Sequence, residues 1–205
     1  MSGEDRRRAF ELVPSLAYYK DELAIFERLL VKWQSKLNLV GPSTVENMWV
    51  RHFADSAQLI DAVPKGKRWA DLGSGAGFPG MVVSFSMKDH RAGEMHLIES
   101  DKRKAAFLRE VSRETGSPAI VHNARCEDVL TDIAPNIVAS RAMADLNTLI
   151  GYAKPFVEKG GIGLFMKGRD IASELTKTSI PSNFTLSITQ SRIDPESSVV
   201  RVESI

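Results

Sequence analysis

The residues best suited to chemistry lie in one glycine-rich segment, residues 71–80, which reads Asp-Leu-Gly-Ser-Gly-Ala-Gly-Phe-Pro-Gly. It follows a short apolar run and leads into another, which is the order of a strand, a tight turn and a helix. Because glycine lacks a Cβ atom, a ligand can lie directly against the backbone of such a turn. We therefore expect a ligand here, with Glu99 at the end of the next predicted strand as a second contact.

The glycine spacing fits two kinds of ligand. The last three glycines, which end at Gly80, match the GxGxxG fingerprint for dinucleotides, and Glu99 follows 19 residues later, where that fingerprint places an acid for the ribose. The first three, which begin at Gly73, match the GxGxG form preceded by an acid, here Asp71, that is typical of S-adenosylmethionine-dependent methyltransferases. A carboxylate at that position repels a pyrophosphate but suits a phosphate-free donor with an ammonium and a sulfonium group. Asp71 thus favours the methyl donor, with the dinucleotide as the alternative. The donor contacts expected from the loop and the fold are Asp71, Gly73, Ser74, Gly75, Gly77 and Glu99.

The segment after the fourth predicted strand, residues 140–144, should face the methyl acceptor. It lacks the Asn/Asp-Pro-Pro-aromatic tetrapeptide of enzymes that methylate exocyclic amines of nucleic acids. Methylation of a pyrimidine carbon needs a cysteine nucleophile, but Cys126 follows the third strand, and we interpret it as a small buried residue. The remaining acceptor has a lone pair and no proton to lose, such as a ring nitrogen, so positioning matters more than a general base.

Two basic residues at strand ends are candidates for that positioning. Arg141 could hydrogen-bond a base edge such as guanine O6, bind the cofactor carboxylate, or form a structural ion pair. Lys167, after the fifth predicted strand, could contact a phosphate, although a lysine beside a helix start is more often solvated.

A polar cluster interrupts the apolar pattern of the N-terminal region. Arg51 and Asp55 lie one helical turn apart and are expected to pair, while His52 and Ser56 share one face. The cluster is a candidate accessory site, with a polar contact between helix and core as the alternative.

These residues need elements to position them, and the chain divides into two unequal parts. Residues 1–63 have a helical pattern, in which Ser15 is a candidate N-cap and Ser43 with Glu46 has the spacing of a capping box. Pro64 and Gly66 break this pattern. We expect an N-terminal helical extension over residues 1–63, packed on a methyltransferase domain over residues 64–205.

After the break, short apolar runs alternate with longer amphipathic stretches. This pattern predicts an α/β, Rossmann-like fold with a mostly parallel seven-stranded sheet and helices on both faces. The parallel strands are predicted at residues 68–72, 95–99, 119–122, 137–140 and 163–166. Helices are predicted after residues 77, 100, 145 and 168, and residues 184–190 and 197–203 should form a closing antiparallel pair.

Composition excludes several classes of protein. The chain has 205 residues, 43% of them apolar, and its net charge of +1 rules out a uniformly basic surface. A nucleic-acid partner would need a local patch, for which the run containing Lys102 and Arg103 is a weak candidate, since most such runs are solvated. The apolar runs are too short for a membrane span, the one cysteine fits a reducing cytoplasm, and the four histidines have no zinc-binding spacing.

Taken together, the motifs resemble one family, the ribosomal small-subunit RNA methyltransferase G family, also called RsmG or GidB. The resemblance covers nearly the whole chain. It comprises Asn38-Leu39-Val40, Arg51-His52-x-x-Asp55-Ser56, the loop over residues 71–80, Glu99-Ser100 with Lys102-Arg103, Arg125-x-Glu127, Ser140-Arg141-Ala142 and Phe165-x-Lys167-Gly168.

The resemblance implies methylation of N7 of a single guanine, guanine-527, in bacterial 16S ribosomal RNA, with S-adenosylmethionine as donor. It implies cofactor contacts at Gly73, Phe78, Cys126, Glu127 and Arg141. Its partner would be the 16S RNA, the small subunit or a precursor of it, and we expect a cytoplasmic monomer. Glu99 replaces the aspartate of many relatives, and Asp101-Lys102 alters the usual sequence before the basic pair.

Two other functions remain open at this stage. The same fold could carry an NAD-dependent reductase, or a ribosome-binding module without catalytic activity. Titration with NADH against S-adenosylmethionine distinguishes the first, and methyl incorporation into 16S RNA distinguishes the second.

Overall fold

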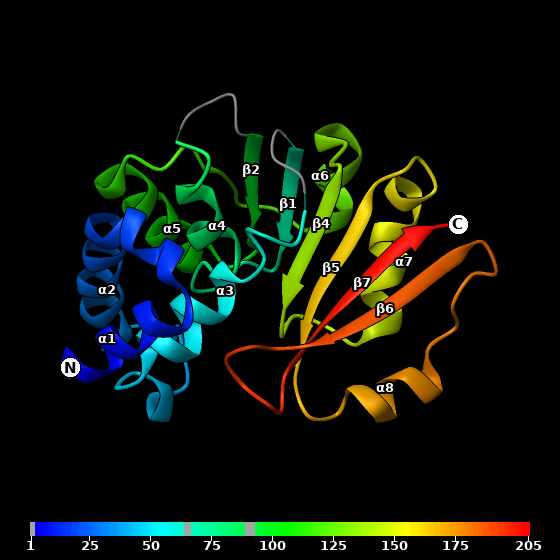
Figure 1. Ribbon diagram of the computed structural model, residues 1–205. Coiled ribbons are helices and arrows are strands. Elements are labelled where there is room, and N and C mark those ends of the chain that lie inside the picture. Colours follow the sequence, from blue (N-terminus) through cyan, green and yellow to red (C-terminus); the bar gives the residue numbers. More distant parts are fainter. Residues whose placement is uncertain (1–2, 64–66, 89–92) are drawn as a thin grey trace.

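The computed structural model describes residues 3–63, 67–88 and 93–205, and a seven-stranded sheet forms its centre (Figure 1). The strands are β1 (Lys67–Leu72), β2 (Gly93–Ile98), β3 (Ile120–His122), β4 (Ile137–Arg141), β5 (Ile162–Lys167), β6 (Phe184–Gln190) and β7 (Ser198–Ser204). Their order across the sheet is β3-β2-β1-β4-β5-β7-β6. The first five strands run parallel, and β7 is antiparallel to both of its neighbours. The predicted α/β, Rossmann-like class is confirmed, and so is the antiparallel closing pair.

Each parallel strand begins and ends within two residues of its predicted range, because a short apolar run buried on both faces has few other placements. The register pairs Leu72 with Ile98 on one side and with Ser140 on the other. The carboxyl ends of β1, β2 and β4 therefore lie at one edge of the sheet. The glycine turn, Glu99 and Arg141 meet at that edge.

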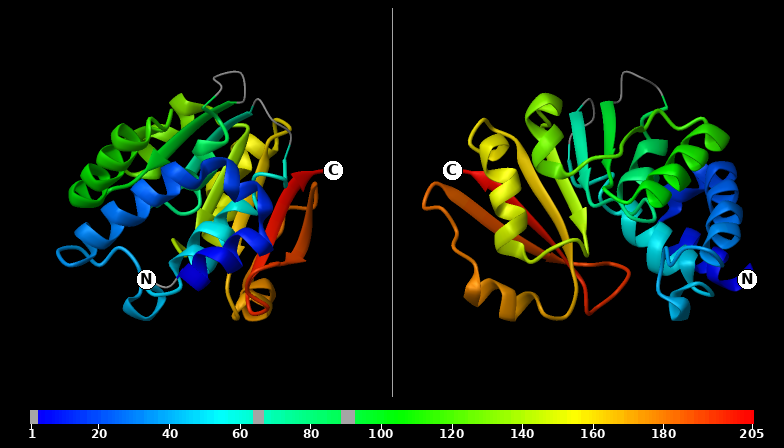
Figure 2. Two further views of the ribbon diagram at one scale, coloured as in Figure 1. Left: turned by 60° about the vertical axis from the view of Figure 1, so that its left-hand side comes forward. Right: turned by 180° about the vertical axis from the view of Figure 1, so that it is seen from behind.

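Helices cover both faces of the sheet (Figures 1 and 2). One face carries α4 (Gly80–Phe85) and α5 (Lys102–Thr115) together with the N-terminal helices, and the other carries α6 (Cys126–Ile133) and α7 (Leu146–Val157). The short α8 (Ile171–Lys177) follows β5 and buries none of its residues. The sequence pattern missed α6, which is only 8 residues long.

The N-terminal region is helical, as expected, but its turns are not the predicted ones. It consists of α1 (Gly3–Leu12), the 3₁₀ turn Pro14–Tyr19, α2 (Lys20–Gln34), the 3₁₀ turn Pro42–Thr44, the π-helical segment Trp49–Ala54 and α3 (Asp55–Ala57). The predicted caps at Ser15 and Ser43 are wrong, because the preceding prolines open short 3₁₀ turns in which both serines lie.

The N-terminal helices share an apolar core with the sheet. The ring of Phe26 from α2 lies 5.3 Å from the rings of both Phe53 and Phe78 and 6.1 Å from that of Phe107. This core fixes the π-helical segment against the glycine turn. The division into two domains at residues 63 and 64 stays a prediction, since residues 64–66 lie outside the described part of the chain.

Within the described residues, no helix combines the length and the apolar character that crossing a membrane requires.

Candidate active site at the carboxyl edge of the sheet

The glycine turn between β1 and α4 is fastened to the end of β2. The Ser74 amide donates to the Ile98 carbonyl at 3.0 Å, and the Gly75 amide donates to the Glu99 carboxylate at 2.8 Å. Gly73 adopts φ +61°, and a Cβ atom there would lie 2.6 Å from Cγ of Met143. Glycine is thus required at this position both by the backbone conformation and by the close approach of another side chain.

Asp71 lies beneath this turn instead of facing the ligand. Its side chain is fully buried, and one carboxylate oxygen accepts a hydrogen bond from the Gly80 amide at 3.1 Å. The other oxygen, Oδ1, has no hydrogen-bond partner among the described residues. Burial raises the pKa of Asp71 to about 7, although the Gly80 amide and the Ser74 side chain favour the ionised form. The expectation of a direct contact with the donor is therefore corrected: Asp71 can act on a ligand only through the turn and its electrostatic field.

A cavity of about 540 Å³ opens beside the turn, and we call it the glycine-loop cavity. The predicted donor contacts that line it are Gly73, Ser74, Gly75, Phe78, Glu99, Cys126, Glu127 and Arg141, whereas Asp71 and Gly77 do not. Residues that are not among the predicted donor contacts also line it, including Leu39, Val40, Lys104 and Tyr152. Tyr152 had no local signal, because it reaches the cavity from the middle of α7, where its hydroxyl donates to Glu127 at 3.2 Å.

Two lining residues have side chains with restricted chemistry. Both oxygens of Glu99 accept backbone amides, one from Gly75 at 2.8 Å and one from Asp101 at 2.7 Å, so the carboxylate orientation is fixed. Cys126 is the first residue of α6 and is buried, and burial raises the pKa of its thiol to about 11. The thiol is therefore protonated at neutral pH, as expected for a packing residue.

Arg141 lines the glycine-loop cavity and is held by several neighbours. Its guanidinium donates to Nδ1 of His52 at 2.6 Å and lies 3.4 Å from both Oδ2 of Asp55 and the carbonyl of Arg51. The Phe78 ring lies 5.1 Å from the guanidinium carbon, and the His52 ring stacks on Phe78 at 4.9 Å. The nearby carboxylate, the hydrogen bonds and the face of the Phe78 ring thus hold the Arg141 guanidinium in place.

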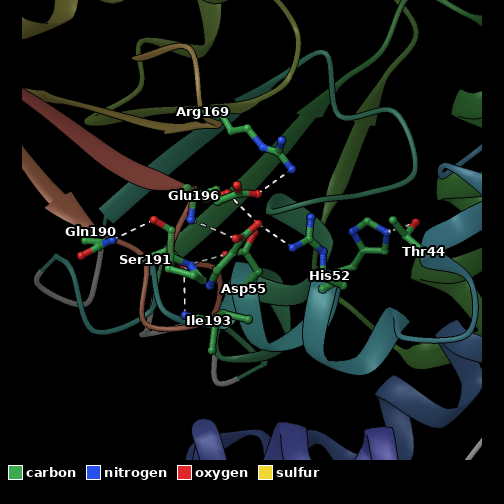
Figure 3. A network of polar contacts seen from close by, with 12 residues as sticks. Thr44, His52, Asp55, Arg169, Gln190, Ser191, Ile193 and Glu196 are labelled. Atoms are coloured by element: carbon green, nitrogen blue, oxygen red, sulfur yellow. Dashed lines mark hydrogen bonds and ion pairs between the residues drawn. The ribbon is translucent and has the colours of Figure 1, made fainter. Parts of the chain in front are cut away.

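These contacts define the state of His52. Because a guanidinium only donates, Nδ1 of His52 must accept, and Nε2 carries the proton that is donated to Oγ1 of Thr44 at 2.9 Å (Figure 3). Burial, reinforced by the nearby charge of Arg141, lowers the pKa of His52 to about 3. The imidazole is neutral throughout the physiological range.

The predicted pair between Arg51 and Asp55 is wrong. The π-helical turn is wider than an α-helical turn, so residues four apart are no longer superposed. Arg51 instead pairs with Asp194 in the turn between β6 and β7. Asp55 accepts from Ser191 of the same turn at 3.1 Å (Figure 3) and approaches Arg141. The sequence pattern does not predict this turn as part of the site, because its partners lie more than 130 residues away along the chain.

A second cavity of about 340 Å³ lies between the π-helical segment and this turn, and we call it the hairpin cavity. It shares His52, Arg141 and Ala142 with the glycine-loop cavity. Ala142 adopts φ +54°, a left-handed conformation that is uncommon for alanine. The backbone is therefore strained where the two cavities meet.

The remaining predicted site residues lie away from the glycine-loop cavity. Lys167 is buried in the wall of the hairpin cavity, where it pairs with Glu174 at 2.7 Å and donates to the Ala144 carbonyl at 2.9 Å, so it is not solvated. Ser56 is fully buried without a side-chain hydrogen bond to the described residues. Lys102 is exposed, and Arg103 donates to the Lys36 carbonyl.

Comparison with known proteins identifies the family. Residues 19–195 match the family model described as rRNA small subunit methyltransferase G. The chain belongs to this family. The ribosomal RNA small subunit methyltransferase G of Rhodospirillum centenum (strain ATCC 51521 / SW) is 48% identical over 186 residues, which are 90% of this chain and 84% of the relative. The ribosomal RNA small subunit methyltransferase G of Methylorubrum extorquens (strain PA1) is 44% identical over 184 residues, which are 89% of this chain and 87% of the relative. The resemblance stated from the motifs is confirmed.

Solved structures similar to this methyltransferase G family member support its fold. An rRNA methylase from Streptococcus thermophilus has a TM-score of 0.54 at 12% identity and covers 76% of this chain and 97% of its own. A mutant of MtNAS in complex with S-adenosylmethionine has a TM-score of 0.57 at 13% identity, with 90% and 75% coverage. Among the residues that the structure describes, no group of three or more His, Cys, Asp or Glu side chains is placed to hold a metal ion.

Proposed function

We propose that this protein transfers a methyl group from S-adenosylmethionine to N7 of guanine-527 in bacterial 16S ribosomal RNA. Family membership carries the coarser part of this statement: the chain is an S-adenosylmethionine-dependent methyltransferase of ribosomal RNA. The guanine and its N7 atom are the finer part, and they rest on the resemblance and on the chemistry of the site. The glycine-loop cavity opening onto Arg141 is the observation that supports them most directly.

The residues of the glycine-loop cavity fit the methyl donor. A cavity of about 540 Å³ suits a ligand of this size, and the glycine turn leaves room for it against the backbone. Glu99 is held by two amides, and its remaining lone pairs can accept the two ribose hydroxyls. S-adenosylmethionine supplies a methyl group on a positively charged sulfur. Acidic residues around the cavity tolerate this charge, and the donor has no phosphate that would need a phosphate-binding site.

The chain's own residues suit an acceptor that needs positioning but no base. His52 is a hydrogen-bond acceptor already used by Arg141, and its low pKa makes it a poor general base. The protonated thiol of Cys126 gives no nucleophile for attack on a pyrimidine carbon. A purine N7 lone pair has no proton to lose, so it can react when Arg141 and the cavity walls hold the base in line with the methyl group.

We also propose that the partner is 16S RNA, a precursor particle or the small subunit, and that the protein works as a cytoplasmic monomer. Arg51 and Arg169 have side chains that are 47% and 76% exposed at the edge of the hairpin cavity, where they can meet RNA phosphates.

The test is methyl transfer to ribosomal RNA from cells that lack this protein, with labelled S-adenosylmethionine. Borohydride reduction and aniline cleave RNA at 7-methylguanosine and map the modified position. We expect one labelled guanine, at position 527. Label on another atom or base would contradict the proposal, and absence of label would favour a binding module without catalytic activity.

A further inference from the structure

Most of the residues that line the hairpin cavity are polar or charged. It touches the glycine-loop cavity only through His52, Arg141 and Ala142. We propose that it holds the guanine nucleotide that accepts the methyl group, and that Arg141 and Asp55 together recognise the O6 and N1–H edge of the base. This inference rests on the proposed function and assigns the acceptor to a place within it.

Arg141 and Asp55 are presented to the cavity in a fixed order. Nη1 of Arg141 lies 3.4 Å from Oδ2 of Asp55, which is longer than a tight ion pair and leaves both groups able to take a further partner. Oδ1 of Asp55 is held by Ser191 at 3.1 Å and by Gln58 at 2.8 Å, and Arg141 is held by His52. The hydrogen-bond donor Arg141 and the hydrogen-bond acceptor Asp55 therefore lie side by side, and their order is fixed.

Asp55 lines the hairpin cavity together with Arg141, which lines both cavities. Burial raises the pKa of Asp55, and the guanidinium of Arg141 opposes this shift by favouring the carboxylate. Arg51 and Asp194 face Asp55 from the same segment and from the β6–β7 turn, and they form an ion pair with each other. A neutral polar ligand group can thus meet Asp55 without leaving another charge unpaired.

Guanine matches this order and adenine does not. In guanine the O6 acceptor lies between N7 and the N1–H donor, so a base with O6 on Arg141 and N1–H on Asp55 directs N7 towards the glycine-loop cavity. In adenine the N6 amino group is a donor and the neighbouring N1 is an acceptor. The amino group would therefore face the donor Arg141, and N1 would face the acceptor Asp55. Single-stranded RNA bases are commonly read along these edges after they leave the stack.

The size and rim of the cavity also suit one nucleotide. Its volume of about 340 Å³ is at the lower end of ordinary small-molecule sites. Val199 and Met166 supply apolar surface, and the exposed guanidinium of Arg169, which pairs with Glu196, lies at the rim (Figure 3). The base would enter this cavity while its phosphates stay at the rim.

The experiment measures binding of free nucleotides to the full protein saturated with S-adenosylhomocysteine, by saturation-transfer NMR at millimolar concentration. Guanosine and inosine monophosphates both keep O6 and N1–H, and we expect both to bind. Adenosine monophosphate and 1-methylguanosine monophosphate should bind at least about tenfold more weakly. Equal binding of all four, or of none, would overturn the assignment.

Variants locate the preference in Asp55. We expect Asp55→Asn to lose the preference for guanosine over adenosine monophosphate, while its circular dichroism spectrum, the check on its fold, matches that of the wild type. Asp145→Asn makes the same change at the exposed cap of α7, outside both cavities, and should keep the preference. A preference retained in Asp55→Asn would overturn the proposal, and so would its loss in Asp145→Asn.

Two outcomes distinguish failure of the nucleotide assignment from failure of the proposed function. Wild-type protein that methylates N7 of ribosomal RNA but shows no preference among the free nucleotides removes only the assignment of the hairpin cavity. Failure of the wild-type protein to methylate N7 removes the proposed function itself.

Discussion

Arg141 lines both cavities, as His52 and Ala142 also do. Its position depends on His52 and Asp55, which hold two of its nitrogens. Cys126, by contrast, lines only the glycine-loop cavity and keeps its proton at neutral pH.

These positions predict different effects of two substitutions. Arg141→Ala should lower kcat/KM for RNA methylation by at least about 100-fold, because the base loses its positioning contact. Cys126→Ser should change it by less than about threefold, since the serine keeps the size of a residue that only packs. Steady-state kinetics with both variants measures this, and equal losses would contradict the assigned roles.

His52 should make the folded protein sensitive to acid. Burial and the charge of Arg141 lower its pKa from 6.5 to about 3, so the unfolded chain binds a proton that the native protein excludes between these values. The contribution of the neutral imidazole to the free energy of unfolding is fully present above pH 6.5. As the pH falls this free energy decreases, by roughly 2 kcal/mol at about pH 5.

His52→Gln keeps an acceptor for Arg141 and a donor for Thr44 but does not titrate. Its free energy of unfolding, from urea titrations, should fall less between pH 6.5 and about pH 5 than that of the wild type. Identical slopes for the two proteins would show that His52 is not the group responsible.

Asp71 should couple donor binding to pH. Because the pKa of Asp71 is about 7 in the free protein, a fraction of the molecules carries a proton on this carboxylate at neutral pH. Binding of the cationic methyl donor disfavours that proton. We expect affinity for S-adenosylmethionine to rise with pH up to about 7 and then level off.

Asp71→Asn should bind the methyl donor more weakly and without this pH dependence, while RNA binding changes less. Calorimetry with each ligand separately measures the order of these effects, and the reverse order would refute it.

At the scale of elements, α8 packs Ile171 and Leu175 against the core, and its Glu174 side chain binds groups outside the helix. Oε2 of Glu174 accepts from Nζ of Lys167 and from the Leu146 amide, both at 2.7 Å, and no residue of α8 is buried. Glu174→Ala should therefore lower the free energy of unfolding by about 2 kcal/mol, because it leaves the buried Lys167 ammonium with one carbonyl and removes the acceptor of an amide.

The matched control is Glu158→Ala, which removes an exposed pair with Lys154 at 3.9 Å. It should cost less than about 0.5 kcal/mol. Equal midpoints in denaturant for the two variants would contradict the role of Glu174.

The elements also show what local sequence can predict. The strand over residues 137–140 was predicted to within one residue, because its apolar run is buried on both faces and bounded by polar residues. The π-helical segment was not predicted, since its apolar residues fit an α-helical period equally well. Its conformation depends on packing, and on contacts such as the Asp5 carboxylate accepting the Trp49 amide at 2.9 Å.

At the scale of the molecule, the site is built from segments that are distant in sequence. The glycine turn, Glu99 and Arg141 could be placed together because parallel strands end at one edge. The pairing of Arg51 with Asp194, 143 residues away, could not, because no periodicity links a helical turn to the turn of a distant hairpin. The sequence therefore predicted the residues of the glycine-loop cavity better than those of the hairpin cavity.

The central claim is that the donor occupies the glycine-loop cavity and presents its sulfur to the junction at Arg141. A crystal structure of the protein with S-adenosylhomocysteine tests it most directly. The ribose hydroxyls should lie within hydrogen-bond distance of Glu99, with the sulfur facing Arg141 and the hairpin cavity left free. S-adenosylhomocysteine bound in the hairpin cavity, or bound away from the glycine turn, would contradict the claim.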